Sequence, residues 1–134
     1  MSGRSVIRID LSSAVPAYRQ IADAIRTLLV NRELKPGVQL PTVRQLAIDL
    51  AVHHNTVAEA YRLLCDEGWL DLRRGRGAIV VERAMPNASA KERGALRQRL
   101  RGLIAEMRTA GVSIAAIRDE FDAIARQLAG GREK

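Results

Sequence analysis

The sequence predicts an α+β fold that is mostly α, with a helix-turn-helix and a β-hairpin followed by a two-helix tail. Three observations lead to this prediction. Apolar residues recur at helical spacing before residue 35 and in two short stretches on either side of a break near residue 52. Two strand-like runs flank a basic, glycine-containing turn at residues 73–77. Two further stripes of helical period follow residue 94.

Composition narrows the class of protein. The chain has 134 residues, of which 47% are hydrophobic, so a packed core is expected and global disorder is excluded. The formal net charge of +7 favours a polyanionic partner, either nucleic acid or an anionic membrane surface. A single cysteine, Cys65, excludes a disulfide framework within the chain and a cysteine-rich zinc site. No apolar run reaches the roughly 18–20 residues of a membrane span, so we expect a cytoplasmic protein.

The N-terminal part predicts a short strand and one helix. Residues 6–9 alternate weakly, as a short edge strand does. Pro16 suits the first turn of a helix, where its missing N–H is not needed. The turn at residues 35–37 ends that helix. The apolar stripe of the helix consists of Ile21, Ala22, Ile25, Leu28 and Leu29.

Two short helices joined by a tight turn come next. Thr42 and Gln45 have the spacing of a capping box, which predicts a helix start there and an end near Leu50. The next helix is expected over residues 55–67, and Gly68 stands where a left-handed C-cap belongs. Such a pair indicates a helix-turn-helix.

The period then changes to that of strands. Residues 69–72 and 78–81 are strand-like, and residues 73–77 form a turn between them. A helix-turn-helix followed by a basic hairpin has the layout of a winged helix.

The remaining residues predict a linker and a dimerisation tail. Residues 83–94 read as the linker and residues 95–130 as a helical hairpin. Two short helices cannot bury both apolar stripes alone, so pairing with a second copy is expected, with packing onto the winged helix as the alternative. The stripes consist of Leu96, Leu100, Leu103, Ile104, Met107, Ile114, Ile117, Phe121, Ile124 and Leu128.

Seven short motifs occur in fixed order between residues 7 and 82. Among them are Leu40-Pro41-Thr42-x-Arg44-x-Leu46-Ala47, Asn55-Thr56-Val57-x-x-Ala60-Tyr61, Glu67-Gly68-Trp69-Leu70 and Arg74-Gly75-x-Gly77. Together they resemble the winged-helix DNA-binding domain of the GntR family, and the short tail is similar to that of its YtrA-type branch. The resemblance implies a bacterial transcription factor, commonly a repressor, that binds a double-stranded, inverted-repeat operator as a homodimer.

The resemblance and the helix-turn-helix geometry together indicate the DNA-binding residues. Recognition helices direct their N-terminal residues toward base edges in the major groove, while neighbouring elements hold phosphates. Basic side chains at a wing are attracted to the minor groove. The candidates are Thr42, Arg44, His53, His54, Asn55 and Thr56 in the helix-turn-helix, and Arg74, Gly75, Arg76 and Gly77 in the wing.

Each helix candidate has a structural alternative. Arg44 corresponds to a family arginine that reaches DNA, but it could instead pair with Asp49 or Glu67. Asn55 could read adenine or cap its helix. Thr56 resembles a family threonine that contacts phosphate, although it could also act as a cap.

Three positions depart from the family pattern. His53 and His54 stand where the family commonly has Ser or Thr followed by Arg, and histidine carries a charge only when protonated. A metal site on these two histidines is disfavoured, and we expect neither a metal nor a cofactor. Ala51 occupies a turn position that is often glycine, which allows a different turn geometry.

Other functions are less favoured. The sequence contains no motif of a catalytic triad or of a phosphate-binding loop, so an enzyme is not expected. The main alternative is a nucleoid-associated or plasmid-maintenance protein that uses the same winged helix. Most of the excess charge lies after residue 82. The arginines on one helical face there could contact DNA or border the dimer seam; they are Arg93, Arg97, Arg101 and Arg108. The residues identify no small-molecule effector.

Overall fold

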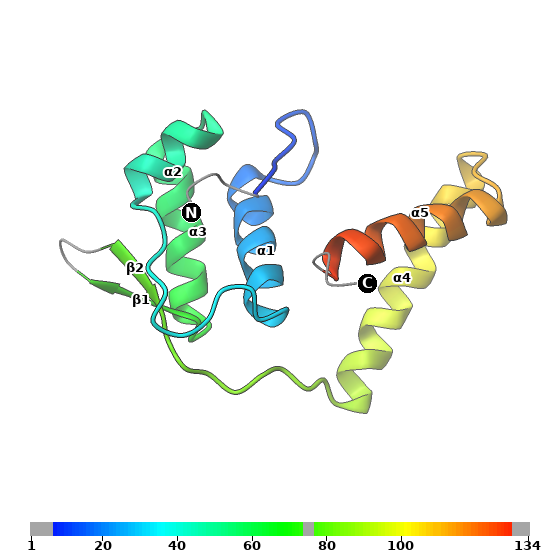
Figure 1. Cartoon of the computed structure of the whole chain (residues 1–134). Coiled ribbons are helices and arrows are strands. Elements are labelled where there is room, and N and C mark those ends of the chain that lie inside the picture. The colour runs from blue at the N-terminus through cyan, green and yellow to red at the C-terminus, as the bar shows by residue number, and fades with distance from the viewer. Residues whose placement is uncertain (1–6, 74–76, 130–134) are drawn as a thin grey trace. The chain divides into compact units, whose positions relative to one another are not determined.

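A computed structural model describes residues 7–73 and 77–129, and the chain divides into two compact units, Met1–Ala84 and Met85–Lys134 (Figure 1). The described residues are mostly helical and include one two-stranded sheet. The elements in order are α1 (Ala17–Val30), α2 (Val43–Leu50), α3 (His54–Asp66), β1 (Leu70–Arg73), β2 (Gly77–Val80), α4 (Ala90–Thr109) and α5 (Ile114–Leu128). The predicted α+β, mostly α fold is confirmed.

The core of the first unit lies where α1 and α2 pack on α3, and the hairpin adjoins α3 (Figure 1). The stripe predicted for α1 faces inward, although Leu28 is only half-buried. Tyr61 is the largest fully buried side chain, and its hydroxyl donates a hydrogen bond of 2.7 Å to the Pro41 carbonyl oxygen. The buried residues at the centre are Ile21, Ala22, Ile25, Leu29, Leu46, Val57, Ala60, Tyr61 and Leu64.

The local start and stop residues of α2 and α3 explain their lengths. The predicted capping box forms: Thr42 Oγ1 accepts from the Gln45 N–H, and Gln45 Oε1 accepts from the Thr42 N–H, both at 3.1 Å. After α3, Gly68 has a φ of 89°, the left-handed conformation expected of it. The backbone N–H of Trp69 then donates to the Leu64 carbonyl, so the chain turns directly into β1.

The hairpin has a third partner that the sequence did not indicate. Strands β1 and β2 pair antiparallel, with Leu70 opposite Val80 and Arg73 opposite Gly77. Residues 37–40 run along the other edge of β2: Gly37 and Leu40 donate backbone hydrogen bonds to it, and Val80 donates to the Val38 carbonyl. The wing is therefore attached to the segment that leads into α2.

The strand predicted at residues 6–9 is wrong for the described residues 7–9, which form no strand. The Gln20 side chain forms hydrogen bonds with the residues that follow this segment. Its Nε2 donates to the Asp10 and Val15 carbonyl oxygens at 3.0 and 2.9 Å, and its Oε1 accepts from the Asp10 N–H at 2.7 Å. One amide side chain thus ties Asp10 and Val15 to the first turn of α1.

Two arginines bind Glu67, the residue that follows the last turn of α3. Arg26 on α1 makes a two-bond contact with the Glu67 carboxylate, Nε–Oε1 2.9 Å and Nη2–Oε2 2.8 Å. The Arg83 guanidinium lies 4.2 Å from the centre of the Trp69 ring, and its Nε donates to the Glu67 carbonyl oxygen at 2.9 Å. Arg83 also donates to the carbonyl of Ala84, so the chain is held to the end of α3 up to the last residue of the unit.

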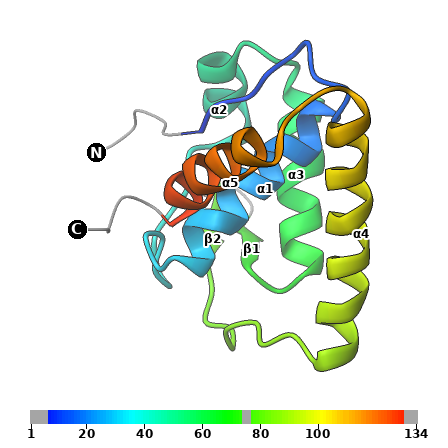
Figure 2. The same ribbon diagram turned by 90° about the vertical axis from the view of Figure 1, so that its right-hand side faces the viewer.

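The second unit consists of α4 and α5, which diverge from a turn after Thr109 (Figure 2). Residues 90–94, expected in the linker, are helical. The reason is a second capping box: Ser89 Oγ accepts from the Glu92 N–H at 3.1 Å, and Glu92 accepts from the Ser89 N–H at 2.8 Å. The Ser113 side chain caps α5, because its Oγ accepts from the Ala116 N–H at 3.1 Å. Residue 130 of the predicted tail lies outside the described residues.

Candidate nucleic-acid interface

The turn between α2 and α3 is held by a left-handed alanine. Ala51 has φ 58° and ψ 45°, and the N–H groups of Ala51 and Val52 donate to the Ile48 and Ala47 carbonyls. The turn therefore keeps the left-handed conformation that the absence of glycine had placed in question. A β-carbon in this conformation costs roughly 1–2 kcal/mol, which the two hydrogen bonds and the packing of both helices must offset.

We expect Ala51→Gly to stabilise the first unit by about 0.5–1 kcal/mol. Glycine relieves the left-handed strain, and its larger unfolded-state entropy removes part of the gain. Urea unfolding of both proteins measures the difference. Ala24→Gly, in the middle of α1, is the matched control and should lose about 1 kcal/mol, because glycine is unfavourable inside a helix. Equal losses in both variants would contradict the left-handed turn.

His53 caps α3. Its Nδ1 accepts from the Asn55 N–H at 3.1 Å, and its ring stacks on that of His54 with 4.4 Å between centroids. The side chains of Asn55 and Thr56 form no hydrogen bond within residues 7–73 and 77–129, so the structure supports neither capping alternative. The side chains at the start of α3 are thus available for a ligand, next to the partial positive charge of a helix N-terminus.

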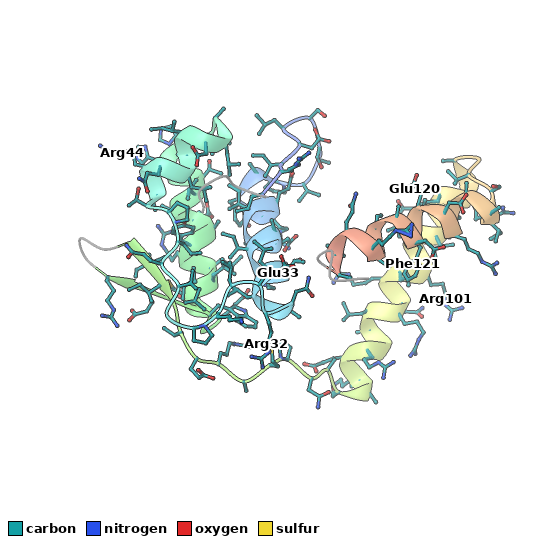
Figure 3. The ribbon with its side chains drawn as sticks, in the orientation of Figure 1. Arg32, Glu33, Arg44, Arg101, Glu120 and Phe121 are labelled. Carbon is teal, nitrogen blue, oxygen red and sulfur yellow. The ribbon has the colours of Figure 1, made fainter. Side chains whose placement is uncertain are left out.

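Arg44 is exposed on α2. Figure 3 shows its side chain on the outer side of that helix, directed away from α1 and α3. Across the described part of the chain Arg44 forms no ion pair, and Glu67, one of its suggested partners, is engaged by Arg26. Thr42 stands two residues earlier, and its hydroxyl proton stays available for a phosphate while the oxygen serves the cap.

The outer face of α3 holds two further polar residues that the motifs did not indicate. Asn55, Glu59 and Arg62 are exposed, while Val57 and Ala60 between them are buried. The spacing of three and four residues places the polar side chains on one side of the helix. Helical periodicity counted outward from the buried residues could have identified Glu59 and Arg62, because that face is the one opposite the core.

Of the four candidate residues in the wing, the structure describes only Gly77. Arg74, Gly75 and Arg76 lie outside the described residues, and Gly77 begins β2 with a φ of 76°. Gly77 stands beside Thr42, since a β-carbon added to it would lie 3.8 Å from the Thr42 Cα. The base of the wing and the N-terminus of α2 are therefore adjacent.

The tail has no buried residue on either helix. Ile104, Met107 and Ile117 are half-buried, and the other predicted dimerisation residues are exposed, with Phe121 at 61% of its surface. The exposed ones are Leu96, Leu100, Leu103, Ile114, Phe121, Ile124 and Leu128.

Other kinds of site find little support. The described residues contain no group of three His, Cys, Asp or Glu side chains that could hold a metal, and no described helix is long and apolar enough to cross a membrane. Cys65 is half-buried, and burial raises the pKa of its thiol, which lowers its nucleophilic thiolate fraction.

A helix-turn-helix on a buried three-helix core, with a β-hairpin attached beside it, defines a winged helix-turn-helix DNA-binding domain. Residues 17–80 match the bacterial regulatory proteins of the gntR family, and the chain belongs to that family. The members of this family are transcription regulators and not enzymes. The matched residues form the DNA-binding winged helix of the family.

Individual relatives extend the match beyond the winged helix. The chain is 32% identical to the HTH-type transcriptional repressor YtrA of Bacillus subtilis over 96% of this chain and 98% of that protein. The solved structure of YtrA from Sulfolobus acidocaldarius, a GntR-family transcription factor, is 40% identical with a TM-score of 0.57, covering 75% of this chain and 99% of that one. A structure described as a transcriptional antiterminator from Listeria monocytogenes has a TM-score of 0.72 at 26% identity over 95% of both chains.

Proposed function

We propose that this protein is a dimeric transcriptional repressor that binds an inverted-repeat operator. In this proposal α3 enters the major groove, with Arg44 and Thr42 beside it, and the wing residues Arg74 to Gly77 contact the minor groove. One observation carries the proposal: the side chains of Arg44 on α2 and Asn55 at the start of α3 are exposed, and neither forms a hydrogen bond or an ion pair within the described residues. Such a regulator would act in the cytoplasm, where the promoters are.

The exposed tail supports the dimer. Each of α4 and α5 carries an apolar stripe along several turns, and neither helix buries a residue within one chain. Covering these stripes removes apolar surface from water, at about 25 cal/mol per Å². A second copy presents the same stripes, as a two-fold interface requires. Two linked winged helices then meet two half-sites, which favours a repeat in the operator.

Fluorescence anisotropy tests the proposal. The protein is titrated onto DNA from upstream of its own gene and onto a scrambled duplex of equal length, at about 0.15 M salt, where non-specific binding is weak. A strong preference for the upstream duplex, saturating at two chains per site, is expected. The nucleoid-associated or plasmid-maintenance alternative predicts two other results. Duplexes of equal length would be bound with equal affinity whatever their sequence, and longer duplexes would be bound more tightly.

We expect Arg44→Ala to weaken operator binding roughly 10- to 100-fold, because a guanidinium on a base edge contributes about 1–3 kcal/mol to discrimination. Arg19→Ala, at an exposed position of α1, is the control that removes the same charge. Anisotropy on the operator and on the scrambled duplex separates the two roles. Arg44 would have no reading role if both variants lost affinity equally on both duplexes.

A further inference from the structure

The outer face of α3 carries a negative charge, that of Glu59, on the side of the helix where Asn55 lies. Glu59 is exposed, four residues after Asn55 and therefore on the same side of the helix. Its carboxylate forms no ion pair or hydrogen bond within the described residues, and the same is true of Arg62, which follows by three. A rise of 1.5 Å per residue places Asn55 and Glu59 about 6 Å apart along the axis. That distance is close to two base steps of about 3.4 Å each.

A carboxylate in this position constrains the sequence that α3 can accept. In the major groove it faces two rows of phosphates, so without a donor it opposes binding to every sequence. The N4 amino group of cytosine is the donor that Glu accepts from in direct readout. Guanine offers only acceptors in that groove, which would repel the carboxylate.

We infer that Glu59 is a specificity-determining residue that accepts a hydrogen bond from the N4 amino group of a cytosine in each operator half-site. The inference rests on the proposed function, because it requires α3 to lie in the major groove. Glu59 selects in two ways: it binds the amino group where cytosine is present, and it disfavours duplexes that present an acceptor there. The competing role is a solvated carboxylate that only offsets the charge of Arg62.

In vitro selection from random duplexes tests Glu59. The full chain is used with Glu59 unchanged, as Glu59→Ala and as Glu59→Gln, and the enriched sequences are then measured by anisotropy with each single base pair replaced. Glu59→Ala should lose a preference of roughly 10- to 100-fold at one C·G pair in each half-site. Because a negative charge is removed, it should also bind more tightly to duplexes that lack this C·G pair. Glu59→Gln should shift that position toward adenine, since an amide can bind adenine N6 and N7 together.

Asp66→Ala is the matched control. It removes the same charge from the last turn of the same helix and should tighten binding without changing any base preference. If Glu59→Ala enriches the same sequence with the same preferences as the unchanged protein, the inference is overturned while the proposed function stands. If the unchanged protein enriches no sequence, the proposed function fails, and the inference fails with it.

Discussion

A Phe121→Asp variant is expected to be monomeric at concentrations where the unchanged protein forms the proposed dimer. Phe121 is the most exposed large apolar residue of the tail, at 61%, and it lies within the stripe of α5. Burying such a side chain contributes about 1.5–3 kcal/mol, and a two-fold interface contains it twice. The dimerisation constant should therefore weaken by at least about 100-fold. Operator affinity should fall with it, because a monomer holds only one half-site.

Analytical ultracentrifugation and anisotropy measure these two effects. Ala123→Asp provides the control: it adds the same charge to α5 two residues further on, about 200° around the helix, where the side chain is exposed. This control should dimerise and bind the operator as the unchanged protein does. A monomeric Ala123→Asp variant together with a dimeric Phe121→Asp variant would place the interface on the opposite side of α5.

Tyr61→Ala is expected to remove about 3–5 kcal/mol from the free energy of unfolding of the first unit, the cost of truncating a large core side chain. Tyr61 is fully buried and joins α3 to the turn before α2 through its bond to the Pro41 carbonyl. Small domains have only about 5–15 kcal/mol of stability, so this variant should be partly unfolded at 37 °C.

Tyr61→Phe separates the hydrogen bond from the packing. It keeps the ring and leaves the Pro41 carbonyl without its donor, which should cost about 1–2 kcal/mol. Burial raises the pKa of Tyr61 above its ordinary value, so the hydroxyl stays protonated and the difference between the two proteins should not change between pH 6 and 9. Urea unfolding followed by circular dichroism measures both variants. A Tyr61→Phe variant as stable as the unchanged protein would show that the bond adds nothing to stability.

Features determined by neighbouring residues could be predicted from the sequence. The capping box of Thr42 and Gln45 and the left-handed turn at Gly68 depend on a few positions, and both formed as expected. The same reasoning applied to Ser89 and Glu92 would have placed the start of α4 correctly. Features that join distant residues could not be read in this way. Arg26 and Glu67 are 41 positions apart, and nothing local to either residue indicates their pairing.

The candidate site shows the same division. The family motifs indicated Arg44 and the first turn of α3, whose positions in the helix-turn-helix follow from local helix signals. His53 as the cap was not foreseen, because histidine is uncommon there and the choice among three neighbouring side chains depends on rotamers. The sequence did not indicate Glu59, because a single charged residue on a helix surface does not form a motif. Its place on the outer face follows only from the burial of the residues on the opposite face of α3.

Arg83, at the end of the first unit, also sets the length of chain that is free between the winged helix and the tail. Because Arg83 holds the chain to the end of α3, the tether between the two units consists only of residues 85–89, of which Ser89 already caps α4. Five residues extend at most about 17 Å. In the proposed dimer each copy contributes one such tether, so the two together limit the spacing of half-sites that can be bound at once. Insertions at the centre of the proposed operator that exceed this combined reach should abolish simultaneous binding to both half-sites.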